Sequence, residues 1–190
     1  QALKPAALLL MLAVAGLAGC AAPAIVPAPE MRVLAPLARF ALEGRLQVRD
    51  GERSAAVGVD WQHDPGRDEW LFTGPLGQGL ARIEADGVGA RMQLSDGRRS
   101  EAASAGELAE ALLGVSAPFE ALPRWVTARP AATAQVRQLD ALGRPLQLVD
   151  QGWTIDYLEY AGESPDSPPR KIDVQRGDTR LRLIVDSWNP

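Results

Sequence analysis

Apolar and polar residues alternate along much of this chain, and this pattern constrains the fold more than any other feature. From Phe40 to Arg49 every second residue is apolar, with Gly44 as the one interruption. A second alternating run follows the turn at Asp50-Gly51 and includes Ala55, Val57, Val59 and Trp61. A period of two is typical of strands with one buried face, so the two runs predict a β-hairpin with a bulge or bend at Gly44.

Further short runs with strand character continue to the C-terminus. Gly- and Asp-containing turns separate several of them. The predicted strands cover residues 70–73, 80–84, 88–94, 98–101, 136–140, 146–149, 153–160, 170–175 and 179–188. Short strands at this spacing favour an antiparallel meander that curls into a sandwich or barrel.

The segment between the two groups of strands has a helical pattern. Ser104 and Glu107 have the spacing of a capping box, and Gly114 can end the helix. The apolar stripe of this helix is predicted to contain Leu108, Ala111 and Leu112. A helical insertion of this kind can lie across one opening of a curved sheet and plug it.

A second short helix is predicted to open at Pro118, with Pro123 able to bend or divide it. Its apolar residues are Phe119, Leu122, Trp125 and Val126. The predicted fold class is therefore mainly β with a helical insertion.

Cys20 is the only cysteine, and it closes the run Leu17-Ala18-Gly19-Cys20 after an apolar stretch that follows Lys4. This arrangement resembles the lipobox of bacterial lipoproteins, in which the cysteine carries diacylglycerol, becomes the N-terminus and is then acylated. An ordinary secretory signal with an incidental cysteine is the alternative. In such lipoproteins an aspartate after the cysteine favours inner-membrane retention, whereas Ala21 permits passage to the outer membrane.

The predicted organisation has three parts. Residues 1–19 form a signal peptide, residues 20–38 form a lipidated N-terminus with an Ala/Pro-rich tether, and residues 39–190 form the folded domain. Removing residues 1–19 takes away only Lys4, so the net charge of −4 becomes −5. That acidity argues against nucleic acid as a partner.

Catalytic and metal-binding patterns are missing from the sequence. His63, the only histidine, stands in the run His63-Asp64-Pro65-Gly66, which predicts a surface turn. One histidine and one cysteine make a zinc site improbable, and no nucleophile elbow, phosphate loop or dinucleotide fingerprint occurs. The chain is therefore predicted not to be an enzyme and to use neither metal nor cofactor. A hydrolase that uses two carboxylates distant in sequence is the alternative, because Asp and Glu are plentiful.

The loop Thr73-Gly74-Pro75-Leu76-Gly77-Gln78-Gly79 has an unusual composition. Its glycines and proline force a turn, yet a large aliphatic residue, Leu76, stands in the middle. An exposed leucine that entered lipid would gain roughly 1.5–3 kcal/mol, which suits reversible contact. The alternative is that Leu76 folds back and caps the sheet edge.

Several segments together resemble the outer-membrane lipoprotein receptor LolB family, from about Phe40 to Trp188. The segments that carry the resemblance are Phe40-Ala41-Leu42-Glu43-Gly44-Arg45, Trp61-Gln62, Gly74-Pro75-Leu76-Gly77, Leu122-Pro123-Arg124-Trp125, Gln151-Gly152-Trp153-Thr154-Ile155 and Asp186-Ser187-Trp188. The resemblance implies an open, strongly curved antiparallel half-barrel with short helices as a lid over an apolar cavity. Two departures are the Ala/Pro-rich tether and the long loop at 162–169.

The resemblance also implies a function. Family members accept lipoproteins from the periplasmic carrier LolA by their acyl chains and insert them into the outer membrane. The expected partners are thus LolA, cargo acyl chains and outer-membrane lipid, with this protein acting as a lipid-anchored monomer that faces the periplasm. In the family a leucine of the protruding loop is needed for insertion, and it matches Leu76, between Pro75 and Gly77.

Apolar residues on the predicted inner faces are candidates for the wall of an acyl-chain cavity. They are Leu42, Leu46, Val57, Val59, Trp61 and Leu183 on the sheet, and Leu108, Leu112 and Trp125 on the lid. Plain core is the alternative for each of them, and it is the commoner role of such residues. A structural or assembly scaffold and a lipid-binding sensor remain alternative functions, and an unfilled, acyl-sized cavity would argue against the scaffold.

Overall fold

The structure is a computed structural model that describes residues 30–31, 34–35, 37–116 and 118–189. Cys20 and the predicted signal peptide lie outside the described residues. The described strands form one sheet of eleven strands. The strands before the helices are β1 (Phe40–Asp50), β2 (Arg53–Asp64), β3 (Arg67–Thr73), β4 (Gly79–Asp86), β5 (Ala90–Leu94) and β6 (Arg99–Ala102). Those after the helices are β7 (Gln135–Leu139), β8 (Pro145–Asp150), β9 (Trp153–Tyr160), β10 (Pro169–Arg176) and β11 (Thr179–Asn189).

The first and last strands lie side by side in the middle of the sheet. The strand order is β6-β5-β4-β3-β2-β1-β11-β10-β9-β8-β7, and neighbouring strands are antiparallel. Each half of the chain is therefore a meander: the first runs from the centre to the edge strand β6, and the second runs from the edge strand β7 back to the centre. The two edges, β6 and β7, are consecutive in sequence but lie on opposite sides of the sheet.

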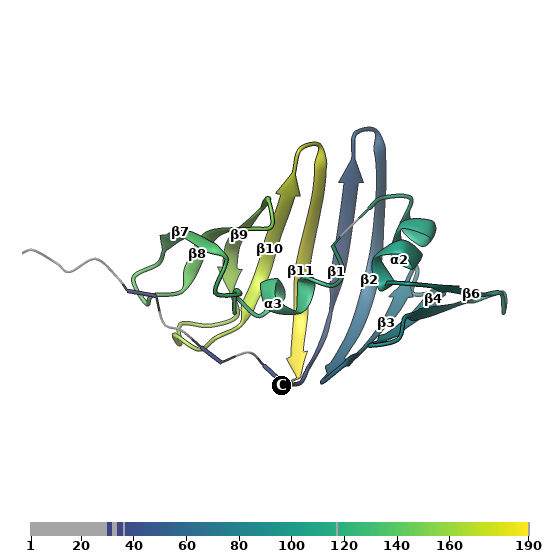
Figure 1. The fold of residues 1–190 in the computed structure, drawn as a ribbon, viewed down its shortest axis with the longest axis horizontal. Coiled ribbons are helices and arrows are strands. Elements are labelled where there is room, and N and C mark those ends of the chain that lie inside the picture. The colour runs from purple at the N-terminus through teal and green to yellow at the C-terminus, as the bar shows by residue number, and fades with distance from the viewer. Residues whose placement is uncertain (1–29, 32–33, 36, 117, 190) are drawn as a thin grey trace, which may run out of the picture.

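The segment between β6 and β7 carries both helices, α2 (Ala105–Leu113) and α3 (Leu122–Val126). Because it joins opposite edges, it has to cross one face of the sheet. Figure 1 shows α2 and α3 lying across the hollow of the curved sheet. The predicted mainly β fold, a curved antiparallel half-barrel with a helical lid, is confirmed.

The alternating pattern of the sequence corresponds to buried and exposed faces. On β1, Phe40, Leu42, Leu46 and Val48 are buried together with Gly44, while Ala41, Glu43, Arg45 and Gln47 are more exposed. The buried side chains of the sheet join those of the helices in one hydrophobic core. This core occupies the concave side, between the sheet and the crossing segment.

The turns alternate between two ends of the sheet. One end, here called the tip end, contains the turn at 51–52, the loop at 74–78 and the turn at 151–152. The opposite end, here called the entry end, contains Phe40, where β1 begins, and the turn at 87–89. In Figure 1 the β1–β2 and β10–β11 turns project together at the tip end.

The first helix begins and ends as predicted, but its buried face matches the predicted stripe only in part. Ser104 Oγ accepts the Glu107 backbone N–H, and Gly114 ends α2 with a φ of 71°. The buried residues are Ala105, Leu108, Ala109 and Leu113, whereas Ala111 is exposed. Of the predicted stripe, Leu108 is buried and Leu112 is half-buried against the core, whereas Ala111 is wrong. The buried face also takes in Ala105, Ala109 and Leu113, because alanines on several sides of the helix left more than one apolar stripe possible.

The second helix is shorter than predicted. Pro118 does not open it, since Pro118 to Ala121 form a turn in which the Ala121 N–H donates to the Pro118 carbonyl at 3.0 Å. Pro123 lies in the first turn of α3, where a missing N–H costs no helical hydrogen bond, so it neither bends nor divides the helix.

Gly44 lies where two backbones approach closely. The β1–β11 register shifts between Glu43 and Gly44, which confirms the predicted irregularity. A Cβ added at Gly44 would lie 2.3 Å from the Ile184 carbonyl oxygen. Backbone is the contacted group, so no side chain can turn away to relieve the clash.

Replacing Gly44 with Ala should therefore separate β1 from β11 locally and lower the free energy of unfolding by about 1–3 kcal/mol. The measurement is urea denaturation. Gly87→Ala is the control, because a Cβ there meets nothing within 4 Å, and its effect should stay within about 0.5 kcal/mol. Equal stability of the two variants would contradict the close-approach explanation.

Candidate functional site

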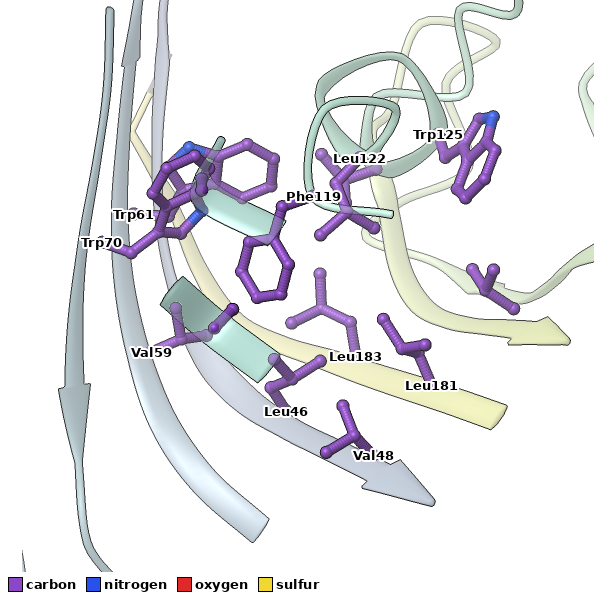
Figure 2. Packing of buried hydrophobic residues seen from close by; sticks show 14 of the residues in the cluster. Leu46, Val48, Val59, Trp61, Trp70, Phe119, Leu122, Trp125, Leu181 and Leu183 are labelled. Carbon is purple, nitrogen blue, oxygen red and sulfur yellow. The ribbon is translucent and has the colours of Figure 1, made fainter. Parts of the chain in front are cut away.

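The link between β6 and β7, which carries α2 and α3, is here called the lid segment. A small apolar cavity lies between it and the concave face of the sheet. Its volume is about 20 Å³, enough for roughly one water molecule. Figure 2 shows Phe119 and Leu122 of the lid segment approaching Leu46, Val59 and Leu183 of the sheet. The lining residues are Leu46, Val59, Trp61, Trp70, Phe119, Leu122, Trp125, Val126, Ile172, Val174, Leu181 and Leu183. The cavity is far smaller than an acyl chain, so the acyl-sized space that would argue against a scaffold is not open in this conformation.

Five of the nine predicted wall residues line this cavity, namely Leu46, Val59, Trp61, Trp125 and Leu183. The other four do not. Leu42 and Val57 are buried elsewhere in the core, and Leu108 and Leu112 belong to α2, which packs over β4, β5 and β6. The wall role of all nine remains a prediction.

Aromatic rings fix the lid segment to one side of the sheet. The Phe119 ring meets Trp70 edge-on, with centroids 5.5 Å apart, and also contacts Phe72 at 6.2 Å. Trp61 and Trp70 lie 5.5 Å apart on neighbouring strands. The lid is therefore held here by apolar contacts that any other apolar group could replace.

On its other side the lid is held by hydrogen bonds to Trp125. The indole Nε1 of Trp125 donates to Asp150 Oδ2 at 2.9 Å, and the Tyr157 hydroxyl donates to the Trp125 carbonyl at 2.9 Å. Burial raises the pKa of the Tyr157 hydroxyl well above its ordinary value. Tyr157 consequently stays protonated, and a donor, across the physiological range.

Leu76 stands at the tip of a structured, protruding loop. Its side chain is 93% exposed, so it does not fold back to cap the sheet edge. Gly77 has a φ of +79°, the left-handed conformation that glycine adopts without strain. Pro75 and Gly77 are exposed beside it.

Gln78 stabilises this loop through hydrogen bonds to Leu76 and Gly74. Its side-chain Oε1 accepts the Leu76 backbone N–H at 3.1 Å, and its carbonyl accepts the Gly74 N–H at 2.8 Å. The Gly77 N–H also donates to the Gly74 carbonyl at 2.9 Å. These bonds hold Leu76 outward, so its exposure is built into the loop.

Comparisons with known proteins match nearly the whole folded part. The model of the family described as "LolB: Outer membrane lipoprotein LolB" matches residues 38–188. The chain is 42% identical over 173 residues to outer-membrane lipoprotein LolB of Azoarcus sp. (strain BH72), covering 90% of this chain and 89% of that one. It is 38% identical over 174 residues to outer-membrane lipoprotein LolB of Thiobacillus denitrificans, covering 90% and 91%.

The chain belongs to the LolB family of outer-membrane lipoproteins. The resemblance seen in the sequence is thus confirmed, with nearly the same limits. Among solved structures, the chain is similar to a LolA superfamily protein from Nitrosomonas europaea, with 7% identity, a TM-score of 0.48 and coverage of 83% of this chain and 88% of that one.

His63 is not the turn residue that the sequence predicted. In this LolB family member it belongs to β2, with its ring stacked on Phe40 at 4.8 Å and its Nδ1 2.8 Å from Asp68 Oδ1. Asp68 also accepts the Trp61 indole N–H at 2.7 Å. The histidine thus forms part of the packing at the entry end of the sheet.

Residues 30–31, 34–35, 37–116 and 118–189 contain neither a membrane-spanning helix nor a metal-binding cluster. Neither described helix is long and apolar enough to cross a membrane. Across these same ranges, no group of three or more His, Cys, Asp or Glu side chains is arranged to hold a metal ion.

Sequence reasoning missed seven of the cavity residues and both polar partners of the lid. The missed lining residues are Trp70, Phe119, Leu122, Val126, Ile172, Val174 and Leu181. Their alternation or helical spacing predicted burial but could not show which of them meet across the sheet. Asp150 gave no signal, because an aspartate before Gln151-Gly152 looks like an ordinary turn residue.

Gly74→Ala tests whether the hydrogen bond from the Leu76 N–H to the Gln78 side chain holds the loop in place. A Cβ there would lie 2.2 Å from the Gln78 Nε2, and the flexible Gln78 side chain would have to leave. We expect stability to change by less than about 1 kcal/mol, while proteolysis next to Leu76 becomes several-fold faster. Gly79→Ala is the control in the same loop, since its Cβ meets nothing within 4 Å. Equal cleavage of both variants would show that Gln78 does not brace the loop.

Proposed function

We propose that this protein accepts lipoproteins from the periplasmic carrier LolA by their acyl chains and inserts them into the outer membrane. It acts without catalysis, metal or cofactor. Its folded domain faces the periplasm, and a lipid on Cys20 holds it at the membrane. Membership of the LolB family supports this function.

The observation that carries the proposal is the apolar cavity beneath the lid segment. All of its lining side chains are apolar or aromatic, which suits a ligand bound by removing methylene groups from water, at about 0.8 kcal/mol each. Most of the wall is the rigid ladder of the sheet, whereas the roof is α3 and the turn before it. The roof has no place in the ladder and can move without breaking strand pairing.

Acyl chains can enter only if the roof moves. A space for about one water molecule has to grow by many times that volume, and displacing Phe119, Leu122 and Trp125 would open it on the concave side. The chains then replace the same apolar contacts that those side chains made. Closed and loaded states therefore bury similar surfaces, which keeps the free-energy cost of opening modest.

Leu76 is the group that meets the bilayer. Burying its exposed side chain in lipid gains roughly 1.5–3 kcal/mol, enough for transient contact but not for anchoring. Transfer needs no nucleotide, because a higher affinity than the carrier's for the same chains sets its direction.

Leu76→Glu should abolish or strongly reduce delivery of cargo to the membrane while leaving uptake intact. The assay loads LolA with radiolabelled lipoprotein, adds the variant, and then adds liposomes. The carrier should lose its cargo to the variant at the normal rate, and the label should then fail to appear in the liposomes. Normal insertion by this variant would refute the role of the loop.

Val88→Glu is the matched control for that experiment. Val88 is also an apolar residue on a tight turn, is 97% exposed and lies at the entry end. The Val88→Glu variant should insert cargo normally, because only the tip end of the sheet meets lipid. The assay also separates the rival functions, since a scaffold would take no cargo from LolA and a sensor would take it without releasing it to liposomes.

The lipid on Cys20 acts as a tether rather than as part of the binding mechanism. An unlipidated Cys20→Ala protein should therefore accept cargo from LolA in solution with a yield close to that of the lipidated form. The measurement is carrier-to-receptor transfer without membranes. If the soluble variant took no lipoprotein, the anchor would have to belong to the binding site.

A further inference from the structure

Asp150 is a buried acidic residue with a single side-chain donor among the described residues. Its side chain is on the concave face, where the residue is 2% exposed. Its Oδ2 accepts the Trp125 indole N–H at 2.9 Å. A buried carboxyl group is tolerated when it is hydrogen-bonded and becomes costly when it is not.

The donor to Asp150 is part of the roof that has to move. Trp125 lines the cavity, and in Figure 2 its indole nitrogen points away from Phe119 and Leu46. The ring therefore separates the apolar cavity from the carboxyl group of Asp150. When the roof opens, this carboxyl group loses its donor and borders the enlarged site.

Asp150 also lies at the end of the sheet that carries Leu76. It is the last residue of β8, beside the turn at 151–152, at the tip end. A ligand with its chains in the core and its polar part at Asp150 would present that polar part to the same end as Leu76. This orientation suits release into a bilayer that the loop contacts.

The acylated N-terminus of a lipoprotein has the matching chemistry. Its cysteine nitrogen is an amide, so one N–H donor stands at the point from which three hydrocarbon chains diverge. The glycerol esters of membrane phospholipids carry acceptors there and no such donor. A buried acceptor that needs a donor discriminates strongly between these two classes.

We propose that Asp150 is the polar recognition residue of the acyl site and accepts the amide N–H of an N-acylated cysteine in exchange for the Trp125 indole N–H. This inference rests on the proposed function and adds the feature by which cargo is told apart from membrane lipid. In this arrangement Asp150 recognises the acylated amide N–H of the cysteine, while the apolar wall binds the hydrocarbon chains.

The test compares two ligands that differ in one donor. One is a synthetic cysteinyl-serine peptide carrying an S-dipalmitoylglyceryl group and an N-palmitoyl amide, and the other is the same molecule methylated on that amide nitrogen. Binding to the purified protein is measured by displacement of a fluorescent fatty acid. The wild-type protein should prefer the N–H ligand by roughly tenfold, the value of one hydrogen bond to a buried acidic acceptor.

Variants assign the preference to Asp150. Asp150→Leu removes the acceptor, and the preference should fall to about one while the fatty acid still binds. Asp150→Asn keeps an oxygen acceptor without the charge, and the preference should fall to roughly threefold. Asp156→Leu, on the neighbouring β9, is the control and should keep the full preference. Thermal unfolding reports whether each variant folds.

The outcomes separate this inference from the function on which it rests. Equal affinity of wild-type protein for both ligands would overturn the role of Asp150 and leave acyl binding intact. A tenfold preference that survives in Asp150→Leu would also overturn it; should that variant not fold, an unchanged preference in Asp150→Asn would do the same. Failure to bind either ligand or the fatty acid would overturn the proposed function itself.

Discussion

The pairing of β1 with β11 is the interaction on which the rest of the structure depends. It joins the two ends of the folded chain at the centre of the sheet. The first half therefore runs outward from the centre to one edge, and the second half runs inward from the opposite edge. The link between those edges then has no route except across a face. The lid is in this sense a topological consequence of the central pair, and the close approach at Gly44 marks how tightly that pair is made.

The sheet and its lid are stabilised in different ways. Every described strand pairs with at least one neighbour in the sheet. In contrast, α3 is a helix of five residues held by aromatic contacts and by two hydrogen bonds at Trp125. Segments with few ladder bonds open at lower free energy than the body of a fold. The division would place movement in the roof and leave the wall unchanged, which is what the proposed acyl site requires in order to fill and empty.

Sequence alone predicted the parts of this fold that local chemistry decides. Period-two alternation gave the strands and their buried faces, and Ser104 and Gly114 gave the limits of the first helix. Long-range geometry was out of reach: two apolar stripes competed on an alanine-rich helix, and Leu42 and Leu46 were indistinguishable although only Leu46 reaches the cavity. The conformation of the loop that exposes Leu76 depends on a hydrogen bond to the Gln78 side chain. The interaction of Asp150 with the lid depends on Trp125, which is distant in sequence and donates its indole N–H to it.

The positions of Leu76 and Phe40 at opposite ends of the sheet set a length requirement. The 11 residues of β1 span about 37 Å at roughly 3.4 Å each, and a chain anchored at Cys20 has to cover at least this distance for Leu76 to face the same bilayer. Leu34 and Leu37 lie against the domain beside Tyr160 and Trp188, so about 14 residues separate Cys20 from the attached part of the chain. At roughly 3.3–3.6 Å each they reach at most about 50 Å. In the proposed anchored state the domain is therefore inverted relative to its attachment, and the number of residues in the tether, more than their identity, determines whether the loop can touch the membrane.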